Sequence, residues 1–384
     1  MSIDRTFRIS LAVTLVCVIL PNMLTLSAQG TPRAIAIYPT ATPTTAIPRI
    51  ARQFHRARHS RCNAASYGPL SYHYPVKPFN RQHPIRGYFG DPRTQTSKNA
   101  IYAPGAPGWF NFHSGVDIVT ATGTPVYPVA SGMASTSNKI VDVKSADGRI
   151  FQYYHVQPSI REGQWVVAYK TVLGHTLAHL GHVHLIEGAG TEKHNPLDPG
   201  HLEPYHDETV PVVDSVQFSD RQGESVDPLQ LEGSVDISAD AHDMPALPIV
   251  GSWPGLGVTP ALVEWKLQAS DGSVVIPRQT VADFRKTELP NRDFWKVYAT
   301  GTHQNKYGSK TPRHVRRIGL YSYNLTPSGL DTRTLRNGVY ILTVEAADTC
   351  GNEGSLSAQI AITNGMTGAL PVSARRPTLV TNTP

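Results

Sequence analysis

Cysteine is scarce in this 384-residue sequence, which contains only Cys17, Cys62 and Cys350. So few cysteines exclude a small disulfide-stapled scaffold, in which bridges take the place of a large core. Cys17 lies within an apolar N-terminal stretch, so at most one disulfide can form between the other two. The sequence leaves both a Cys62–Cys350 bridge and two free thiols open.

Two further patterns are absent. After residue 26 there is no long apolar run, and the basic residues do not alternate with aromatic ones. The first absence excludes a membrane span in the body of the chain, and the second argues against a nucleic-acid partner. The formal net charge of +6 fits both attraction to an anionic polymer such as a cell wall and ordinary solubility.

The N-terminus has the pattern of an export signal. Arg5 and Arg8 precede an apolar stretch over residues 9–20, and residues 26–28 offer a small-residue cleavage site. This pattern predicts a signal peptide over residues 1–28 and a protein that is secreted or associated with the cell envelope. An uncleaved N-terminal anchor is the alternative, because apolar character continues to residue 26.

Glycine and proline are abundant, at 31 residues each, which predicts a mainly β, loop-rich protein. Residues 29–81 begin rich in threonine and proline and are expected to form a linker and N-terminal segment. Residues 82–207 are expected to form a first β-rich domain and residues 208–365 a β-sandwich, whereas residues 366–384 have no pattern and are expected to be a disordered tail. The alternating apolar positions of the second domain are Val235, Ile237 and Ala239, then Val263, Trp265 and Leu267, then Tyr340, Leu342, Val344 and Ala346.

Histidines are concentrated in the first domain, with nine of the 16 between His113 and His206. Neutral imidazole is a common metal ligand and general base, so this clustering predicts a metal or catalytic site. His113 precedes Asp117 by four residues, and the glycine and β-branched residues around them favour a turn that runs into a strand. A histidine and an aspartate together suit a borderline cation such as zinc.

Two further histidine motifs follow in the same domain. His182 and His184 lie in an apolar run that predicts a strand, in which side chains two apart project from one face. One of them can therefore bind a metal while its neighbour contacts a metal-bound water. His155 lies in a short apolar strand that ends at Pro158 and is expected to face the same groove. A single histidine of this kind is usually a packed or exposed residue, but three such motifs together favour a site.

In this order, the motifs resemble the signature of the LytM/lysostaphin-type zinc endopeptidases, which cleave peptide cross-links in peptidoglycan. The resemblance covers about residues 82–205. The signature consists of His-x-x-x-Asp, a Tyr-x-His strand and His-x-His, which are here His113 to Asp117, Tyr153 to His155, and His182 to His184.

The resemblance implies an antiparallel β-sheet metallopeptidase domain of lysostaphin-like fold that binds one Zn²⁺ per chain. His113, Asp117 and His184 would be the zinc ligands, which leaves a fourth position for water, as in catalytic zinc sites. Zinc lowers the pKa of such a water to about 7. His182 would act as the general base and His155 would donate a hydrogen bond or a proton, although these two roles can be exchanged.

The resemblance also implies a function. The chain would be a secreted zinc metalloendopeptidase that hydrolyses peptide cross-links of bacterial peptidoglycan by attack of zinc-bound water, with peptidoglycan or cell-wall peptides as its partner. Two alternatives stay open. One is a wall-binding or regulatory protein that uses the domain for docking, and the other is a general secreted protease of glycine-rich proteins.

Two segments near the motifs depart from the family pattern or lie outside it. The loop over residues 175–180 is rich in histidine and leucine where family members carry small polar residues and glycine. Within it, His175 and His179 either contact the metal or line the groove and are exposed. Residues 60–83 are a candidate segment to fold over the site and supply a fourth ligand, and the side chains concerned are Tyr72, His73 and His83.

The C-terminal half resembles an immunoglobulin- or fibronectin-type sandwich, and the best match is the hairpin over residues 338–348. A sandwich of this kind does not by itself imply a function. A basic run between residues 306 and 317 fits either contact with an anionic surface or a solvated loop.

Overall fold

The computed structural model describes residues 51–56, 62, 68–96, 104–105, 108–178, 180–250, 255–305 and 318–366. The expected signal peptide, the basic run, His179 and all but the first residue of the expected tail lie outside these described residues. Residues Ala46–Pro384 cluster into one compact unit. In the described part of the chain, no helix is long and apolar enough to cross a membrane.

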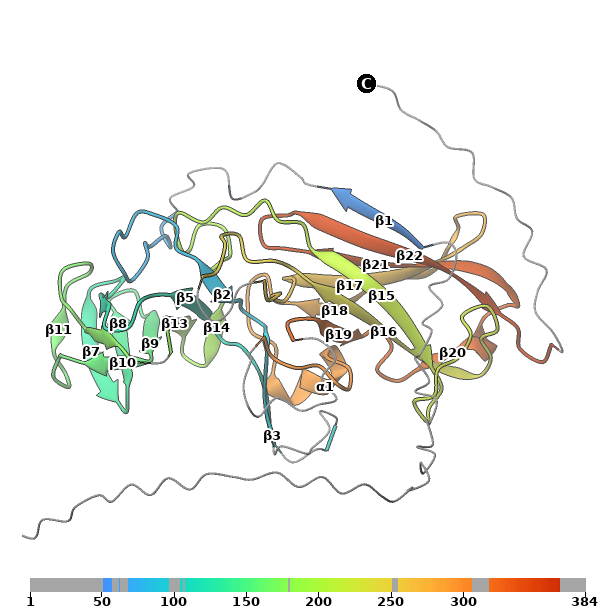
Figure 1. The fold of residues 1–384 in the computed structure, drawn as a ribbon, viewed down its shortest axis with the longest axis horizontal. Coiled ribbons are helices and arrows are strands. Elements are labelled where there is room, and N and C mark those ends of the chain that lie inside the picture. Colours follow the sequence, from blue (N-terminus) through green and yellow to red (C-terminus); the bar gives the residue numbers. More distant parts are fainter. Residues whose placement is uncertain are drawn as a thin grey trace, which may run out of the picture. The chain divides into compact units, whose positions relative to one another are not determined.

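An eight-stranded antiparallel sheet carries the histidine motifs. Its strands follow the order β11-β7-β8-β9-β13-β5-β2, and β14 pairs with β13 (Figure 1). A three-stranded sheet, β10-β12-β6, and the hairpin β3-β4 complete this part of the fold. The bounds are β2 (Ile85–Gly87), β3 (Pro92–Thr96), β4 (Gly108–Phe112), β5 (Val116–Val119), β6 (Pro125–Val126), β7 (Gly132–Ser137), β8 (Ile140–Ser145), β9 (Ile150–Tyr154), β10 (Val156–Pro158), β11 (Trp165–Val166), β12 (Gly174–Thr176), β13 (His182–Ala189) and β14 (Glu192–His194).

Alternation of apolar side chains explains why these segments form strands. In β8 the buried residues Val141 and Val143 are two apart, and in β9 so are Phe151 and Tyr153, as expected for strands with one face packed on a core. β13 is different, because buried residues follow one another along most of its length. It is therefore a central strand that is covered on both faces, and it carries two of the candidate histidines.

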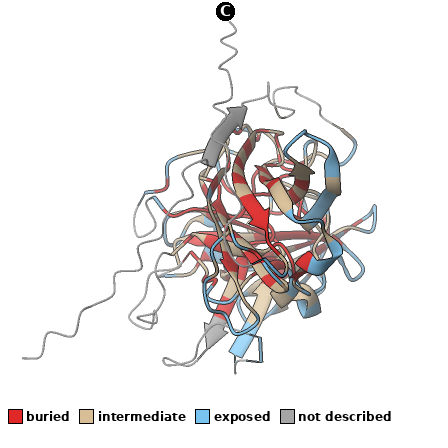
Figure 2. Cartoon of the chain, turned by 90° about the vertical axis from the view of Figure 1, so that its right-hand side faces the viewer, coloured by how far each residue is buried: buried red, intermediate tan, exposed pale blue. Residues whose placement is uncertain are grey.

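Two more antiparallel sheets form the second part of the fold and share one hydrophobic core. One has the order β1-β22-β21-β17-β18, and the other has the order β15-β16-β19 with β20 paired to β16. The alternating apolar positions noted in the sequence are all buried, and Figure 2 shows buried residues running along the strands. The predicted mainly β architecture with antiparallel sheets is confirmed. The bounds are β1 (Ala51–Arg56), β15 (Val212–Ser219), β16 (Ser234–His242), β17 (Leu262–Ala269), β18 (Val274–Asp283), η2 (Asn291–Asp293), α1 (Phe294–Val297), β19 (Tyr321–Asn324), β20 (Leu330–Asp331), η3 (Thr332–Thr334), β21 (Gly338–Ala347) and β22 (Glu353–Ile362).

Part of the segment expected to be a linker is built into the fold. β1 pairs antiparallel with β22, although it lies within residues 29–81. Further along, Tyr72, Tyr74 and Val76 are buried in the core of the eight-stranded sheet. These three residues alternate along the chain, so they present one apolar face to that core. The composition typical of a linker is confined to the threonine- and proline-rich beginning of the segment.

The hairpin β3-β4 connects the two hydrophobic cores. Phe112, at the end of β4, belongs to the core of the second part, where its ring centroid lies 5.3 Å from that of Phe284. A buried hydrogen bond also joins the two parts of the fold here. Oδ1 of Asp91 accepts from the backbone N–H of Thr259 at 2.7 Å. Because His113 directly follows Phe112, packing in the second part helps to position the first candidate ligand.

Cys62 and Cys350 form a disulfide with an S–S distance of 2.03 Å, across a sequence separation of 288 residues. Of the two possibilities that the sequence left open, the structure contains the bridge. It links Cys62, which lies between β1 and β2 in the sequence, to the turn between β21 and β22. Cys350 is fully buried in the core of the eight-stranded sheet, so the bridge joins this core to the second part of the fold.

Replacing both cysteines with alanine should lower the free energy of unfolding by about 2–5 kcal/mol, because the bridge closes a long loop in the unfolded chain. Urea unfolding of the double variant and of the oxidised wild type measures the difference. The wild type in reductant is the control and should unfold like the variant. Equal stability of the oxidised wild type and the variant would contradict a bridge in the folded protein.

Candidate metal centre

Two adjacent strands position the three candidate ligands. β5 pairs antiparallel with β13, and in this register Asp117 lies opposite His184. His113 lies in the turn between β4 and β5, as predicted from the sequence. Gly115 is required in this turn, because a Cβ there would collide with the backbone carbonyl of Leu185 in β13. A glycine thus allows the turn to approach the central strand.

The structure brings His113, Asp117 and His184 together. Nε2 of His113 lies 2.7 Å from Nδ1 of His184, which lies 3.0 Å from Oδ1 of Asp117. The third side of this triangle, from Oδ1 of Asp117 to Nε2 of His113, measures 3.3 Å. Nδ1 of His113 lies 2.8 Å from the backbone carbonyl of Tyr88 and donates to it, so Nε2 directs its lone pair toward the group.

This donor set fits a zinc ion. Imidazole nitrogens and a carboxylate oxygen are ligands that zinc accepts, and three protein ligands leave a fourth position open. One nitrogen or oxygen atom from each residue lies within 4.8 Å of the others, so the group could hold a metal ion. His113 and Asp117 are each 3% exposed, whereas the side chain of His184 is 12% exposed. Solvent therefore reaches the group on the side of His184.

Burial keeps three imidazoles of this region neutral. It lowers the pKa of His113 to about 3 and the pKa values of His155 and His182 to about 4. Burial also opposes the ionisation of Asp117. His113 and His182, which become charged in acid, and then two permanently charged arginines hold its pKa well below the usual range. At neutral pH the site therefore presents nitrogen lone pairs and a carboxylate, which are the protonation states that metal binding requires.

The two arginines hold the second oxygen of Asp117. Oδ2 lies 2.9 Å from Nη2 of Arg93 and 3.4 Å from Nη2 of Arg86. Gly87 permits this approach, because a Cβ there would lie 2.6 Å from Oδ2 of Asp117 and 2.7 Å from Nη2 of Arg93. Partners of this kind orient metal ligands. Sequence reasoning assigned no role to either arginine. The Arg-Gly pair at residues 86–87 was a sequence signal that could have pointed to Arg86.

His182 adjoins the group on the same strand as His184. Its Nδ1 lies 2.7 Å from the backbone carbonyl of Leu180 and donates to it, which makes Nε2 the acceptor. Nε2 lies 3.5 Å from Oδ1 of Asp117 and 3.1 Å from Nη2 of Arg86. The predicted strand is confirmed, and the two histidines project from one face of it toward Asp117.

His155 lies beside His182, but the prediction that it lies within a strand was wrong. β9 ends at Tyr154 and β10 begins at Val156, and His155 between them has a φ of 66°. This left-handed conformation is uncommon for a residue other than glycine and interrupts the strand. The ring centroids of His155 and His182 are 4.7 Å apart. In the described part of the chain, the ring of His155 has no hydrogen-bond partner, so it can bond to a substrate.

The other candidate side chains lie elsewhere. His175 in β12 is exposed. The hydroxyl of Tyr72 donates to Glu187 at 2.7 Å, and ring nitrogens of His73 and His83 bond to backbone carbonyls. Among the described residues, the segment before residue 84 therefore supplies no fourth ligand to the group. Its polar side chains instead form hydrogen bonds that hold the segment in place.

Replacing Arg93 with glutamine should weaken zinc binding by about 10–100-fold, because Asp117 loses the partner that orients its outer oxygen. Competition with a chromophoric zinc chelator measures this affinity. Arg81→Gln, at an exposed arginine, is the matched control and should bind zinc like the wild type. An unchanged zinc affinity in the Arg93 variant would show that the arginine does not support the ligand.

Comparisons with known proteins give partial structural likenesses. No family model and no curated protein matches the chain. It is similar to the catalytic domain of the antimicrobial peptidase lysostaphin from Staphylococcus simulans, with 21% identity and a TM-score of 0.21, over 22% of this chain and 77% of that one. A mutant catalytic domain of the prophage-encoded M23 protein EnpA from Enterococcus faecalis matches with 22% identity and a TM-score of 0.21, over 32% and 89% of the two chains. The solution structure of lysostaphin matches with 12% identity and a TM-score of 0.22, over 70% and 90%. The structural neighbours thus include M23 peptidase domains, and TM-scores this low do not by themselves assign an activity.

Proposed function

We propose that this chain is a secreted zinc metalloendopeptidase that hydrolyses peptide cross-links of bacterial peptidoglycan. The observation that carries the proposal is the group formed by His113, Asp117 and His184, whose donor atoms lie 2.7–3.3 Å apart. A structural zinc site is closed by four protein ligands, whereas a catalytic one has three and an open position. The two neutral imidazoles beside the open group, those of His155 and His182, favour the catalytic kind.

The proposed chemistry is the hydrolysis of an amide bond. A zinc ion held by the three ligands would supply Lewis-acid activation of the water and of the scissile carbonyl. His182 accepts the proton of the attacking water on Nε2, which its bond to Leu180 leaves as the acceptor. The same proton then passes to the leaving amine when the C–N bond breaks.

His155 has a different role in this scheme. Burial lowers its pKa to about 4, so its ring is neutral at pH 7 and carries one N–H group. A neutral imidazole is a poor source of protons but a good hydrogen-bond donor. It therefore stabilises the negative charge that develops on the carbonyl oxygen during attack. In this scheme His182 is the general base, and His155 is the hydrogen-bond donor that stabilises the carbonyl oxygen.

The substrate class rests on the order and spacing of the three motifs, which are those of peptidoglycan endopeptidases. Secretion rests on the export signal in residues 1–28, and the basic net charge favours contact with an anionic wall. A docking protein with this domain would bind wall peptides and leave them intact. A general protease would cleave elastin-like glycine-rich peptides as readily as wall cross-bridges.

The purified protein should release peptides from isolated peptidoglycan, lose this activity in a chelator and regain it when zinc is added, because the metal is needed for water activation. Muropeptide chromatography and free-amine release measure the cleavage. Elastin-like peptides are the comparison substrate and should be cleaved more slowly. Binding of peptidoglycan without any released amine would contradict the proposed activity and favour docking.

Replacing His113 with alanine should abolish zinc binding and hydrolysis together, because a ligand is lost. His155→Ala should retain zinc and lower kcat by about 10²–10⁴-fold, the usual contribution of a positioned acid, base or donor. Metal content and kcat are measured on the same samples. His175→Ala, at an exposed histidine in β12, is the matched control. Full activity of the His113 variant would refute the ligand assignment.

A further inference from the structure

Three acidic side chains outside the metal centre are buried together. Asp207, Asp243 and Asp348 are 1%, 1% and 5% exposed, and one carboxylate oxygen of each lies within 4.8 Å of the others. Asp207 follows the first β-rich part, Asp243 directly follows β16, and Asp348 directly follows β21. Since these segments are far apart in the sequence, the cluster exists only in the folded chain.

The hydrogen bonds to this acidic cluster come from neutral groups. Asp207 accepts from the hydroxyl of Tyr205 at 2.8 Å and from the hydroxyl of Thr209 at 2.5 Å. Asp348 accepts from the side-chain amide of Asn352 at 2.6 Å. Among the described residues, no lysine, arginine or histidine forms an ion pair with any of the three carboxylates. Buried charges are normally paired or coordinate a metal, so this cluster lacks the usual compensation.

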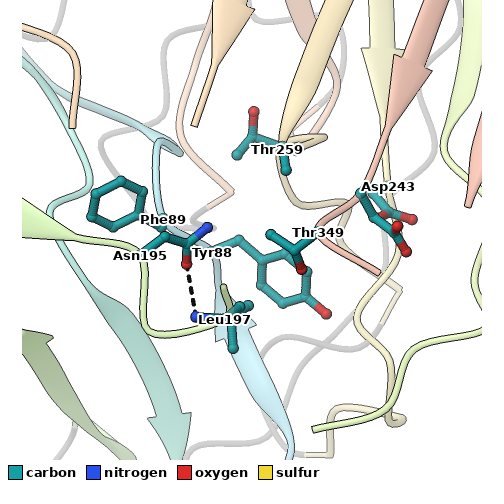
Figure 3. Close-up of a pocket in the computed structure, with 9 residues that line it drawn as sticks. Tyr88, Phe89, Asn195, Leu197, Asp243, Thr259 and Thr349 are labelled. Atoms are coloured by element: carbon teal, nitrogen blue, oxygen red, sulfur yellow. Dashed lines mark hydrogen bonds between the residues drawn. The ribbon is translucent and has the colours of Figure 1, made fainter. Parts of the chain in front are cut away.

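Asp243 is the least satisfied member of the cluster. Its Oδ1 accepts from the backbone N–H of Met244 at 2.7 Å and lies 3.1 Å from the hydroxyl oxygen of Thr209, which makes its shorter bond to Asp207. Its Oδ2 is buried and has no hydrogen-bond partner. Asp243 and Asp348 line a cavity of about 10 Å³, which is room for one water-sized sphere. Figure 3 shows Asp243 among the residues that line this cavity. A buried oxygen without a partner costs free energy, so this position favours a ligand that binds oxygen.

The cluster resists ionisation when it has no counter-ion. Burial raises the pKa of Asp348 to about 7. Burial, together with the charges of Asp207 and Asp348, raises the pKa of Asp243 well above its usual range. Three neighbouring carboxylates can be compensated either by retained protons or by a bound cation. The cavity beside Asp243 and Asp348 provides space for one water-sized ligand on their side of the cluster.

We propose that Asp207, Asp243 and Asp348 bind one Ca²⁺ ion, which ties the end of the first β-rich part to two strands of the second. Carboxylate oxygens, without nitrogen or sulfur, are the ligands of hard cations. Calcium–oxygen bonds of about 2.3–2.6 Å allow ligand oxygens up to about 5 Å apart, and the oxygens of the cluster lie within 4.8 Å of one another. Mg²⁺ gives up its water reluctantly and seldom occupies a buried site built from protein oxygens, so such a site favours calcium. Backbone carbonyls and water would complete the coordination of calcium.

Calcium titration of the full chain tests the proposal, with the chain first loaded with zinc so that the metal centre is filled. Isothermal titration calorimetry over about 0.01–10 mM covers the affinities of extracellular calcium sites. We expect one Ca²⁺ per chain, a Tm that rises with calcium concentration, and binding of Mg²⁺ that is at least about tenfold weaker. No binding heat and no rise in Tm at about 10 mM would overturn the proposal and leave a cluster that shares protons.

Asp243→Asn tests the location of the ion, because it removes one charge with little change in shape and relieves repulsion in the cluster. It should lower calcium affinity at least about tenfold and remove the response of Tm to calcium. Asp227→Asn, at an exposed aspartate between β15 and β16, is the matched control and should bind calcium like the wild type. Should Asp243→Asn fail to fold, Asp348→Asn serves in its place. Wild-type calcium affinity in a folded variant would overturn the assignment.

Discussion

The antiparallel pairing of β5 with β13 is the interaction on which the candidate metal centre depends. It sets Asp117 opposite His184, so a candidate ligand from each strand reaches the same point. Side chains in a strand alternate between two faces, and a register slip of one residue would turn His184 away from Asp117. Val183 and Leu185 are fully buried behind the histidines, and the same slip would move both out of the core. The hydrophobic core therefore enforces the geometry of the polar site.

Burial and the positive charge of the arginines oppose each other in their effect on the pKa of Asp117, whereas both lower the pKa values of His113 and His182. Burial keeps His113 and His182 neutral, which leaves their lone pairs available. The same burial would protonate Asp117 if no positive charge were near. Arg86 and Arg93 oppose this effect, and they do so at Oδ2, so that Oδ1 remains turned toward the histidines. The carboxylate thus stays ionised without being drawn away from the ligand group.

The second β-rich part supports the centre although it contributes none of the candidate ligands. Phe112 inserts into its core, and the next residue is His113. Tyr88 makes a second connection, since its carbonyl accepts from His113 at 2.8 Å and its hydroxyl accepts from the backbone N–H of Ala246 at 2.9 Å. The same hydroxyl donates to Asp207 at 3.4 Å. One residue therefore contacts both a proposed zinc ligand and a proposed calcium ligand. The disulfide strengthens the same junction, because it joins the two parts of the fold covalently.

Local patterns in the sequence determined the antiparallel β architecture, the turn before Asp117 and the strand that carries His184, because alternation and glycine positions act over a few residues. Only the tertiary structure decided which side chains from distant segments meet. The support of Asp117 by Arg93 and the acidic cluster around Asp243 are contacts across the fold, and no short-range pattern encodes them. The conformation of His155 could not be predicted from the sequence either, because the apolar residues on both sides of it fit a continuous strand. A left-handed φ is uncommon for any residue other than glycine, so the residue type alone did not predict it at His155.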